Sequence, residues 1–203
     1  MNGNTTDRLS QKDNCRKEKI GSLLDEASTI ARRVLDSIQT LTGTTACKGV
    51  QIARLKEWAQ SNNLWIEDAR TLGTFSDRGS ENEVYLSLES NRVYKLNDFR
   101  YSDDNLMPFF ERIRIHNRLF EDCPYVMIGM AENQSGKPCV VLTQPYILAE
   151  REATEEEITE ELLRLGFHPE MEGEYFSNGY FDTYRSLSPN YSPKTFGNLN
   201  ENP

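Results

Sequence analysis

The chain has 203 residues, with 32 acidic and 23 basic side chains and a net charge of −9. This acidic balance argues against a general nucleic-acid binder, whose surface is usually basic. Hydrophobic residues make up 37% and aromatic residues 10%, enough for a buried core, which excludes a wholly disordered chain. The charge is also uneven, because residues 150–174 contain ten acidic and two basic residues.

The four cysteines form no CxxC pair, so the sequence indicates neither a zinc site nor a redox motif. We therefore expect reduced thiols in a cytoplasmic protein. The first twenty residues lack the apolar region of a secretory signal. There is no run of 18 apolar residues, so we expect no contact with a membrane.

Residues 1–17 are polar and are expected to form a flexible N-terminus. Apolar residues then recur every three or four positions from Ile20 to Ile38, which predicts an amphipathic helix. Packing against the domain is favoured for its apolar face, with docking onto a partner as the alternative. A second helix is predicted over about 48–62, so residues 18–64 form a helical N-terminal segment.

The pattern then changes to alternation. Residues 83–88 and 92–96 predict two strands of a hairpin, and residues 104–120 predict a helix. Residues 125–131 and 139–142 predict a second pair of strands.

A last helix is predicted from Thr154 to Leu165. Thr154 and Glu157 have the spacing of a capping box, and Gly166 supplies the C-terminal stop. Residues 186–203 are rich in Ser, Pro and Asn and are expected to be loop.

Lys95 lies in the alternating stretch of the second strand, where Val93 and Lys95 share a face. Such a lysine is usually a solvent-facing residue, but its neighbours favour another interpretation. A turn containing Gly79 and Ser80 precedes it, and such a turn can bring backbone N–H groups close to phosphates. Glu111 lies on the next helix. A strand lysine paired with a helix glutamate is the device by which protein kinases orient nucleotide phosphates.

Several stretches of the chain resemble the polyvalent protein kinases of Bacteroides-type bacteria and their mobile elements. The resemblance covers roughly Trp58 to Tyr191. Its motifs are Glu81-Asn82-Glu83-Val84-Tyr85, Val93-Tyr94-Lys95-Leu96-Asn97-Asp98, Pro108-Phe109-Phe110-Glu111-Arg112, His116-Asn117, Gln144-Pro145, the run from Arg151 to Ile158, and Leu165-Gly166-Phe167.

The resemblance implies an α+β fold. Residues 65–147 would form a kinase-like small lobe, an antiparallel sheet of about five strands with a helix. Residues 148–203 would form a partial helical lobe, reduced and incomplete, with a loop-rich C-terminal tail.

The resemblance also implies a site for ATP with Mg²⁺. Gly79, Ser80 and Lys95 would face the phosphates, with Glu111 positioning Lys95. The adenine would lie along a connector that includes Gln144, Tyr146 and Ile147.

Asp182 is the candidate catalytic base and Asn190 the candidate metal ligand. Their eight-residue spacing is longer than the catalytic loop of the family requires, and if Ser186 occupies the aspartate position instead, the base is lost. Asp182 or Asp98 is a further candidate for holding a metal.

Two functions follow as hypotheses. The first is a kinase-like module, a pseudokinase whose catalysis is impaired, which binds nucleotide weakly and interacts with a protein. Its acidic segment, residues 150–174, would suit a basic partner. The alternative is an atypical ATP-dependent protein kinase that uses Lys95, Glu111 and Asp182.

Overall fold

The computed structural model describes residues 6–79, 82–147, 151, 153–171, 175–179 and 182–184, with the backbone alone for residues 6–22 and 182–184. The chain divides into two units, residues 1–146 and 147–203. None of the described helices is long and apolar enough to cross a membrane.

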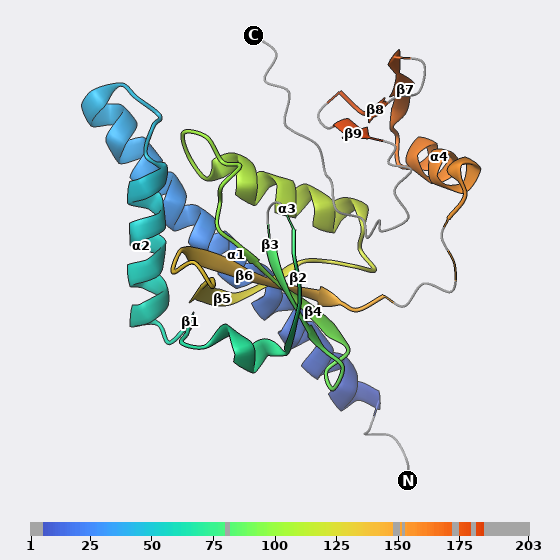
Figure 1. The fold of residues 1–203 in the computed structure, drawn as a ribbon, viewed down its shortest axis with the longest axis horizontal. Helices are drawn as coiled ribbons and strands as arrows, with labels where there is room; N and C mark the ends of the chain where they lie inside the picture. Colours follow the sequence, from blue (N-terminus) through green and yellow to red (C-terminus); the bar gives the residue numbers. More distant parts are fainter. Residues whose placement is uncertain are drawn as a thin grey trace. The chain divides into compact units, whose positions relative to one another are not determined.

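The first unit is a mixed α and β structure (Figure 1). Its elements, in chain order, are α1 (Thr6–Thr42), α2 (Lys48–Ser61), β1 (Trp65–Ile66), the 3-10 helix η1 (Ala69–Leu72), β2 (Thr74–Arg78), β3 (Asn82–Ser87), β4 (Arg92–Asn97), α3 (Met107–Leu119), β5 (Val126–Glu132) and β6 (Pro138–Pro145).

Six strands form one sheet in the order β1-β5-β6-β4-β3-β2. The pairs are antiparallel except that of β1 with β5, which is parallel. The predicted α+β class is confirmed, as are the two predicted hairpins. The sheet has one strand more than the predicted number of about five, because the two-residue strand β1 is too short to leave an alternating pattern.

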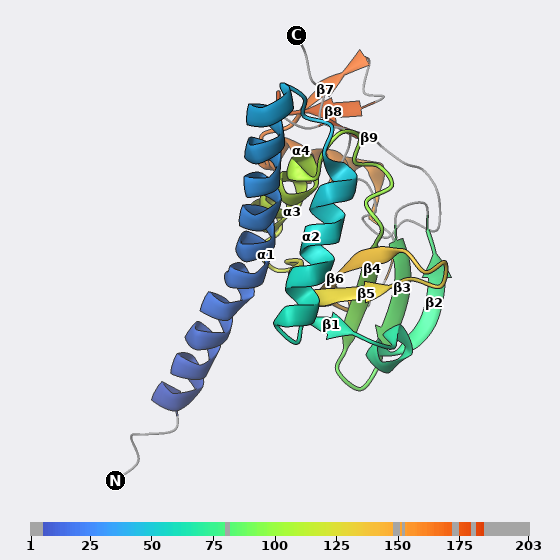
Figure 2. The ribbon, with the colours of Figure 1, turned by 90° about the vertical axis from the view of Figure 1, so that its left-hand side faces the viewer.

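The helices α1, α2 and α3 lie together on one face of the sheet (Figure 2). The amphipathic pattern of the first helix is confirmed, because its apolar face enters the core there. The buried members of this core are Leu24, Ala27, Ala31, Leu55, Ala59, Phe99, Leu106, Phe109, Phe110, Ile113, Met127, Met130, Val140 and Leu142. Removing this apolar surface from water is what holds the helices to the sheet.

A smaller apolar cluster covers the opposite face, where η1 packs against β3. Its buried members are Tyr85, Leu96, Ala131, Cys139 and Val141. Successive side chains of a strand point to opposite faces, so Lys95 and Leu96 on β4 face different clusters.

Buried Gln51 joins the three helices. Its Nε2 donates to the carbonyl oxygen of Ala31 on α1 at 2.9 Å, and its Oε1 accepts from the N–H of Leu106 before α3 at 2.8 Å. Both ends of this amide are satisfied, which a buried polar side chain requires.

Helix α1 begins at Thr6, within the segment predicted to be flexible. The prediction rested on the polar composition of residues 1–17. This stretch nevertheless contains two Arg, two Lys and one Gln, which have good helix propensity.

The second unit contains α4 (Glu155–Arg164) and the strands β7 (His168–Glu170), β8 (Tyr175–Ser177) and β9 (Asp182–Tyr184), which form a three-stranded sheet. The predicted capping box of α4 is confirmed by the reciprocal bonds between Thr154 and Glu157. Residues 148–203 were predicted to form a partial helical lobe and a loop-rich tail. Part of this segment instead forms the small sheet. A strand of three residues is too short to show an alternation of apolar and polar side chains, so the sequence did not predict these strands.

Gly129 provides a test of how β5 is placed against the backbone of Leu64. Its φ is +155°, and an added Cβ would lie 2.2 Å from the carbonyl oxygen of Leu64. That oxygen also accepts from the N–H of Met130 at 2.9 Å, so the backbone cannot retreat freely. We expect Gly129→Ala to lower the free energy of unfolding by about 1–3 kcal/mol in urea denaturation. Gly49→Ala is the control, because its added Cβ meets nothing within 4 Å, and it should not lower the free energy of unfolding. Equal stability of the two variants would contradict this placement.

Candidate functional site

Lys95 lies on β4, near the middle of the six-stranded sheet. Its Cα partners are Val84 on β3 and Leu142 on β6, and the residue is only 9% exposed. Leu142 belongs to the core on the helix side, so Lys95 faces the same side. A charged group in such a position must find polar partners, because burial removes its hydration.

Tyr125, just before β5, is one such partner. The ammonium of Lys95 donates to the Tyr125 hydroxyl at 2.8 Å and lies 4.9 Å from the centre of the ring. The same tyrosine therefore offers the cation both an oxygen acceptor and the negative face of a π system.

The C-terminal part of α3 fixes Tyr125 in place. The side-chain amide of Asn117 accepts from the Tyr125 N–H and donates to its carbonyl oxygen, both at 2.7 Å. The ring of His116 lies 4.4 Å from the Tyr125 ring, and His116 Nε2 lies 3.0 Å from the carbonyl oxygen of Cys123.

Two ionisable groups respond to the buried lysine. Burial lowers the pKa of His116, and the charge of Lys95 lowers it further, against the opposing effect of the hydrogen bond to Cys123. Burial raises the pKa of the Cys123 thiol, and Lys95 opposes that rise. The Nε2 of Gln144 lies 3.5 Å from the Cys123 sulfur. We refer to Lys95, His116, Asn117, Cys123, Tyr125 and Gln144 as the lysine cluster.

Glu111 is turned away from the lysine cluster. Its side chain is 55% exposed and lies 3.7 Å from a guanidinium nitrogen of Arg114. Among the residues that the structure describes, no ion pair within 4.0 Å joins Lys95 to Glu111. Helix α3 buries Phe110 and Ile113, and successive helix positions are about 100° apart, so Glu111 falls on a different face.

The other residues predicted to bind a nucleotide differ in whether their backbone N–H groups already have acceptors. The N–H of Gly79 donates to the carbonyl oxygen of Asn82 at 2.9 Å, so it closes the turn, and Ser80 lies outside the described residues. The N–H of Tyr146 donates to the carbonyl oxygen of Asn91 at 3.0 Å.

Gln144 and Ile147 differ in exposure. Gln144 is 8% exposed, and its Oε1 has no hydrogen-bond partner among the described residues. Ile147 is 58% exposed and begins the second unit. Gln144 pairs with Val93, which shares a strand face with Lys95, so the Gln144 side chain lies on the same face of the sheet as Lys95.

The two candidates for catalysis and metal binding lie in the second unit. Asp182 is the first residue of β9, where its Cα pairs with that of Ser177. Asp182 therefore lies on a short strand, whereas the family resemblance implied a catalytic loop. Asn190 lies outside the described residues. Within the described part of the chain, no three His, Cys, Asp or Glu side chains are grouped as metal ligands.

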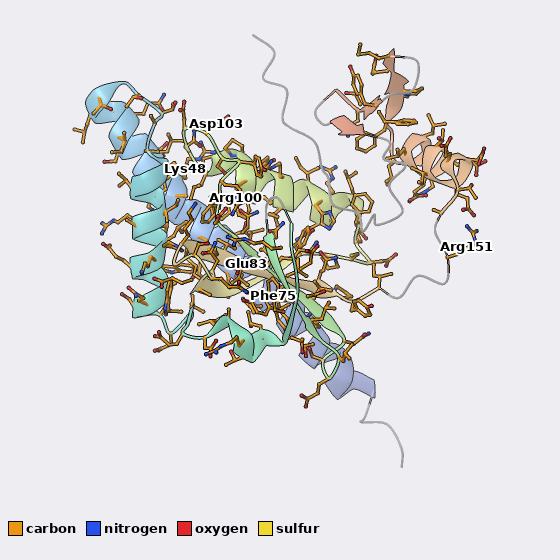
Figure 3. All side chains as sticks on the ribbon, in the orientation of Figure 1. Lys48, Phe75, Glu83, Arg100, Asp103 and Arg151 are labelled. Atoms are coloured by element: carbon orange, nitrogen blue, oxygen red, sulfur yellow. The ribbon has the colours of Figure 1, made fainter. Side chains whose placement is uncertain are left out.

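The face of the sheet opposite Lys95 carries two buried carboxylates. Asp98 accepts from Nε and a terminal nitrogen of Arg100 at 2.9 and 2.7 Å, and Glu83 lies 3.6 Å from Arg78. Figure 3 shows the side chains of Glu83 and Arg100 near the sheet. Burial and these two carboxylates raise the pKa of Cys139 to about 12. Because Asp98 is committed to Arg100, the structure offers no support for it as a metal ligand.

The sequence did not reveal the role of Tyr125. It is the first residue of a predicted strand and has no spacing that links it to Lys95. In the strand order β5-β6-β4 the strand β6 lies between the two, and the ends of their long side chains meet at 2.8 Å. The pair His116-Asn117 was noticed in the sequence, but not its contact with Tyr125.

A comparison with known protein families gives a match. A family model described as a serine/threonine/tyrosine kinase found in polyvalent proteins matches residues 48–180, more than half of the chain. No curated protein and no solved structure matches. The matched range includes α2 and the whole six-stranded sheet, and it ends before Asp182 and Asn190.

The pH dependence of stability tests the carboxylate of Asp98. Its hydrogen bonds to Arg100 hold its pKa below the ordinary value, more strongly than burial raises it. A depressed folded-state pKa gives stability that is present above about pH 4 and is lost as the pH falls through the folded-state value. We expect Asp98→Asn to lower the free energy of unfolding at pH 7 and to flatten its decline in acid. Asp36→Asn, at an exposed position on α1, should leave the wild-type curve unchanged. A decline in Asp98→Asn as steep as that of the wild type would contradict the assignment.

Proposed function

Because the chain belongs to the family of serine/threonine/tyrosine kinases found in polyvalent proteins, we propose that it is a kinase-type module that binds ATP through the ammonium of Lys95 and transfers phosphate poorly. The observation that carries the proposal is the burial of Lys95 on β4, beside the connector that begins at Gln144. A buried cation on the central part of a sheet is costly, and a phosphate ligand is a chemical reason to keep it there.

The chemistry of Lys95 suits a phosphate. An ammonium can donate three hydrogen bonds, so the bond to Tyr125 is compatible with a phosphate oxygen as a further acceptor. Gln144 adds a polar group on the same side of the sheet, and its Oε1 can accept a hydrogen bond from an amino group such as that of adenine. The N–H groups of Gly79 and Tyr146 already have backbone acceptors, so the proposal gives them no part in binding.

We expect poor phosphate transfer because several groups that catalysis needs are not in place among the described residues. No three His, Cys, Asp or Glu side chains of those residues are grouped as metal ligands, and the candidate ligand Asn190 lies outside them. The candidate base Asp182 lies beyond the range matched by the family, and its spacing to Asn190 is long. Glu111 pairs with Arg114 instead of Lys95. Metal ions and a positioned base are major parts of phosphoryl transfer.

The alternative is an atypical kinase with Asp182 as its base. The presence of both Lys95 and Glu111 in the chain is the observation that supports it. A rotation of α3 that carried Glu111 to the lysine cluster would complete the pair.

The acidic segment supports an interaction role for the second unit. Two of its acids are partnered by arginines, Glu157 by Arg151 and Glu161 by Arg164. The sequence of residues 150–174 carries ten acidic and two basic residues, and Glu156, Glu160 and Glu170 are exposed among its described residues, so we assign this segment to a basic protein partner.

ATP binding is tested by thermal shift with and without Mg²⁺. For an ATP concentration about ten times the Kd, we expect the melting temperature of the wild type to rise by about 3 °C. Lys95→Ala should abolish the rise. Lys137→Ala, which removes an exposed lysine near the opposite face, should preserve it. No rise at millimolar ATP, or the same rise in Lys95→Ala, would contradict the proposed nucleotide site.

Phosphate transfer is tested by ADP formation and by mass spectrometry of the protein after incubation with ATP and Mg²⁺. We expect turnover at least about a hundredfold below the roughly 1–100 s⁻¹ of ordinary kinases. Turnover in the ordinary range that is lost in Asp182→Asn would overturn the impaired module and establish the atypical kinase.

A further inference from the structure

The lysine that would bind phosphate is held by a neutral aromatic residue. The hydroxyl of Tyr125 accepts from Lys95 at 2.8 Å, and the ring lies 4.9 Å from the ammonium. A phenol is an uncharged acceptor at neutral pH, so this contact orients the ammonium through a neutral group.

Tyr125 is in turn held by α3 at both its backbone and its ring. The two 2.7 Å bonds with Asn117 fix the backbone, and the ring of His116 packs at 4.4 Å. His116 is 4% exposed and its Nε2 lies 3.0 Å from the carbonyl oxygen of Cys123, in the segment that leads to Tyr125. The end of α3 therefore determines where the phenol lies.

We propose that Tyr125 is the positioning residue for Lys95, and that α3 acts on the lysine through His116, Asn117 and Tyr125 rather than through Glu111. The proposal rests on the proposed function, in which Lys95 binds the phosphates of ATP. In this arrangement the phenol selects the direction of the ammonium, and a shift of the C-terminal turn of α3 changes that direction.

The variant Tyr125→Phe tests the hydroxyl, because it keeps the ring that packs on His116. A matched control is Tyr94→Phe, on the same strand as Lys95 but on the other face, where its hydroxyl lies 3.5 Å from Ser90 Oγ. The third variant, Glu111→Gln, removes the charge that the alternative pairing needs. All three are made in the full chain, and thermal melting checks that each is folded.

The first readout compares the affinities of ATP and adenosine by calorimetric titration. Adenosine lacks phosphates, so its affinity reports on the base-binding part alone. We expect Tyr125→Phe to weaken ATP about tenfold, the effect of losing one hydrogen bond to a charged group, and to leave adenosine unchanged. Glu111→Gln and Tyr94→Phe should change neither. A tenfold loss in Glu111→Gln with none in Tyr125→Phe would overturn the proposal, as would equal losses of ATP and adenosine in Tyr125→Phe.

The second readout needs no nucleotide. In ¹⁵N-labelled protein, a hydrogen-bonded ammonium that exchanges slowly with water gives an NMR signal, and Lys95→Met identifies the one from Lys95. We expect this signal in the wild type, Tyr94→Phe and Glu111→Gln, and its loss in Tyr125→Phe. If the wild type binds neither ATP nor adenosine, the proposed function fails, and this signal still decides whether Tyr125 holds the lysine. A signal unchanged in Tyr125→Phe would refute the positioning role.

Discussion

The burial of one ammonium group constrains the helix side of this sheet. Lys95 lies on β4 among apolar neighbours, where an uncompensated charge would destabilise the fold. The hydroxyl and ring of Tyr125 are one partner of this ammonium, and Asn117 and His116 on α3 fix Tyr125 in place. The lysine cluster thus joins a strand, a helix and the start of another strand around a single cation.

The two faces of the sheet have different roles because alternate residues of β4 face opposite ways. Lys95 faces α3, whereas Asp98 and Glu83 lie on the other face with Arg100 and Arg78. The carboxylates there are satisfied by neighbouring arginines and form a structural network. The lysine face alone combines a buried cation with a side-chain acceptor, Gln144 Oε1, that has no partner among the described residues. This difference is why we assign the nucleotide to the helix side.

Local patterns predicted the elements well, because alternation and helical spacing are local signals. The strands around Lys95 and the capping box of Thr154 are examples. Contacts that depend on strand order were beyond the sequence, and Tyr125 is the clearest case. The pairing of Lys95 with Glu111 was predicted from a kinase pattern, but α3 is turned so that Phe110 and Ile113 are buried and Glu111 is exposed. The packing of apolar side chains decided the rotation of that helix.

The most direct measurement is an experimental structure of the full chain with a non-hydrolysable ATP analogue and Mg²⁺. The account predicts that the ammonium of Lys95 lies within about 3.2 Å of a phosphate oxygen, the distance of a charge-assisted hydrogen bond. It also predicts that the bond to Tyr125 is kept. A bound nucleotide whose phosphate oxygens all lie beyond about 4 Å from that ammonium, the limit of an ion pair, would contradict the account.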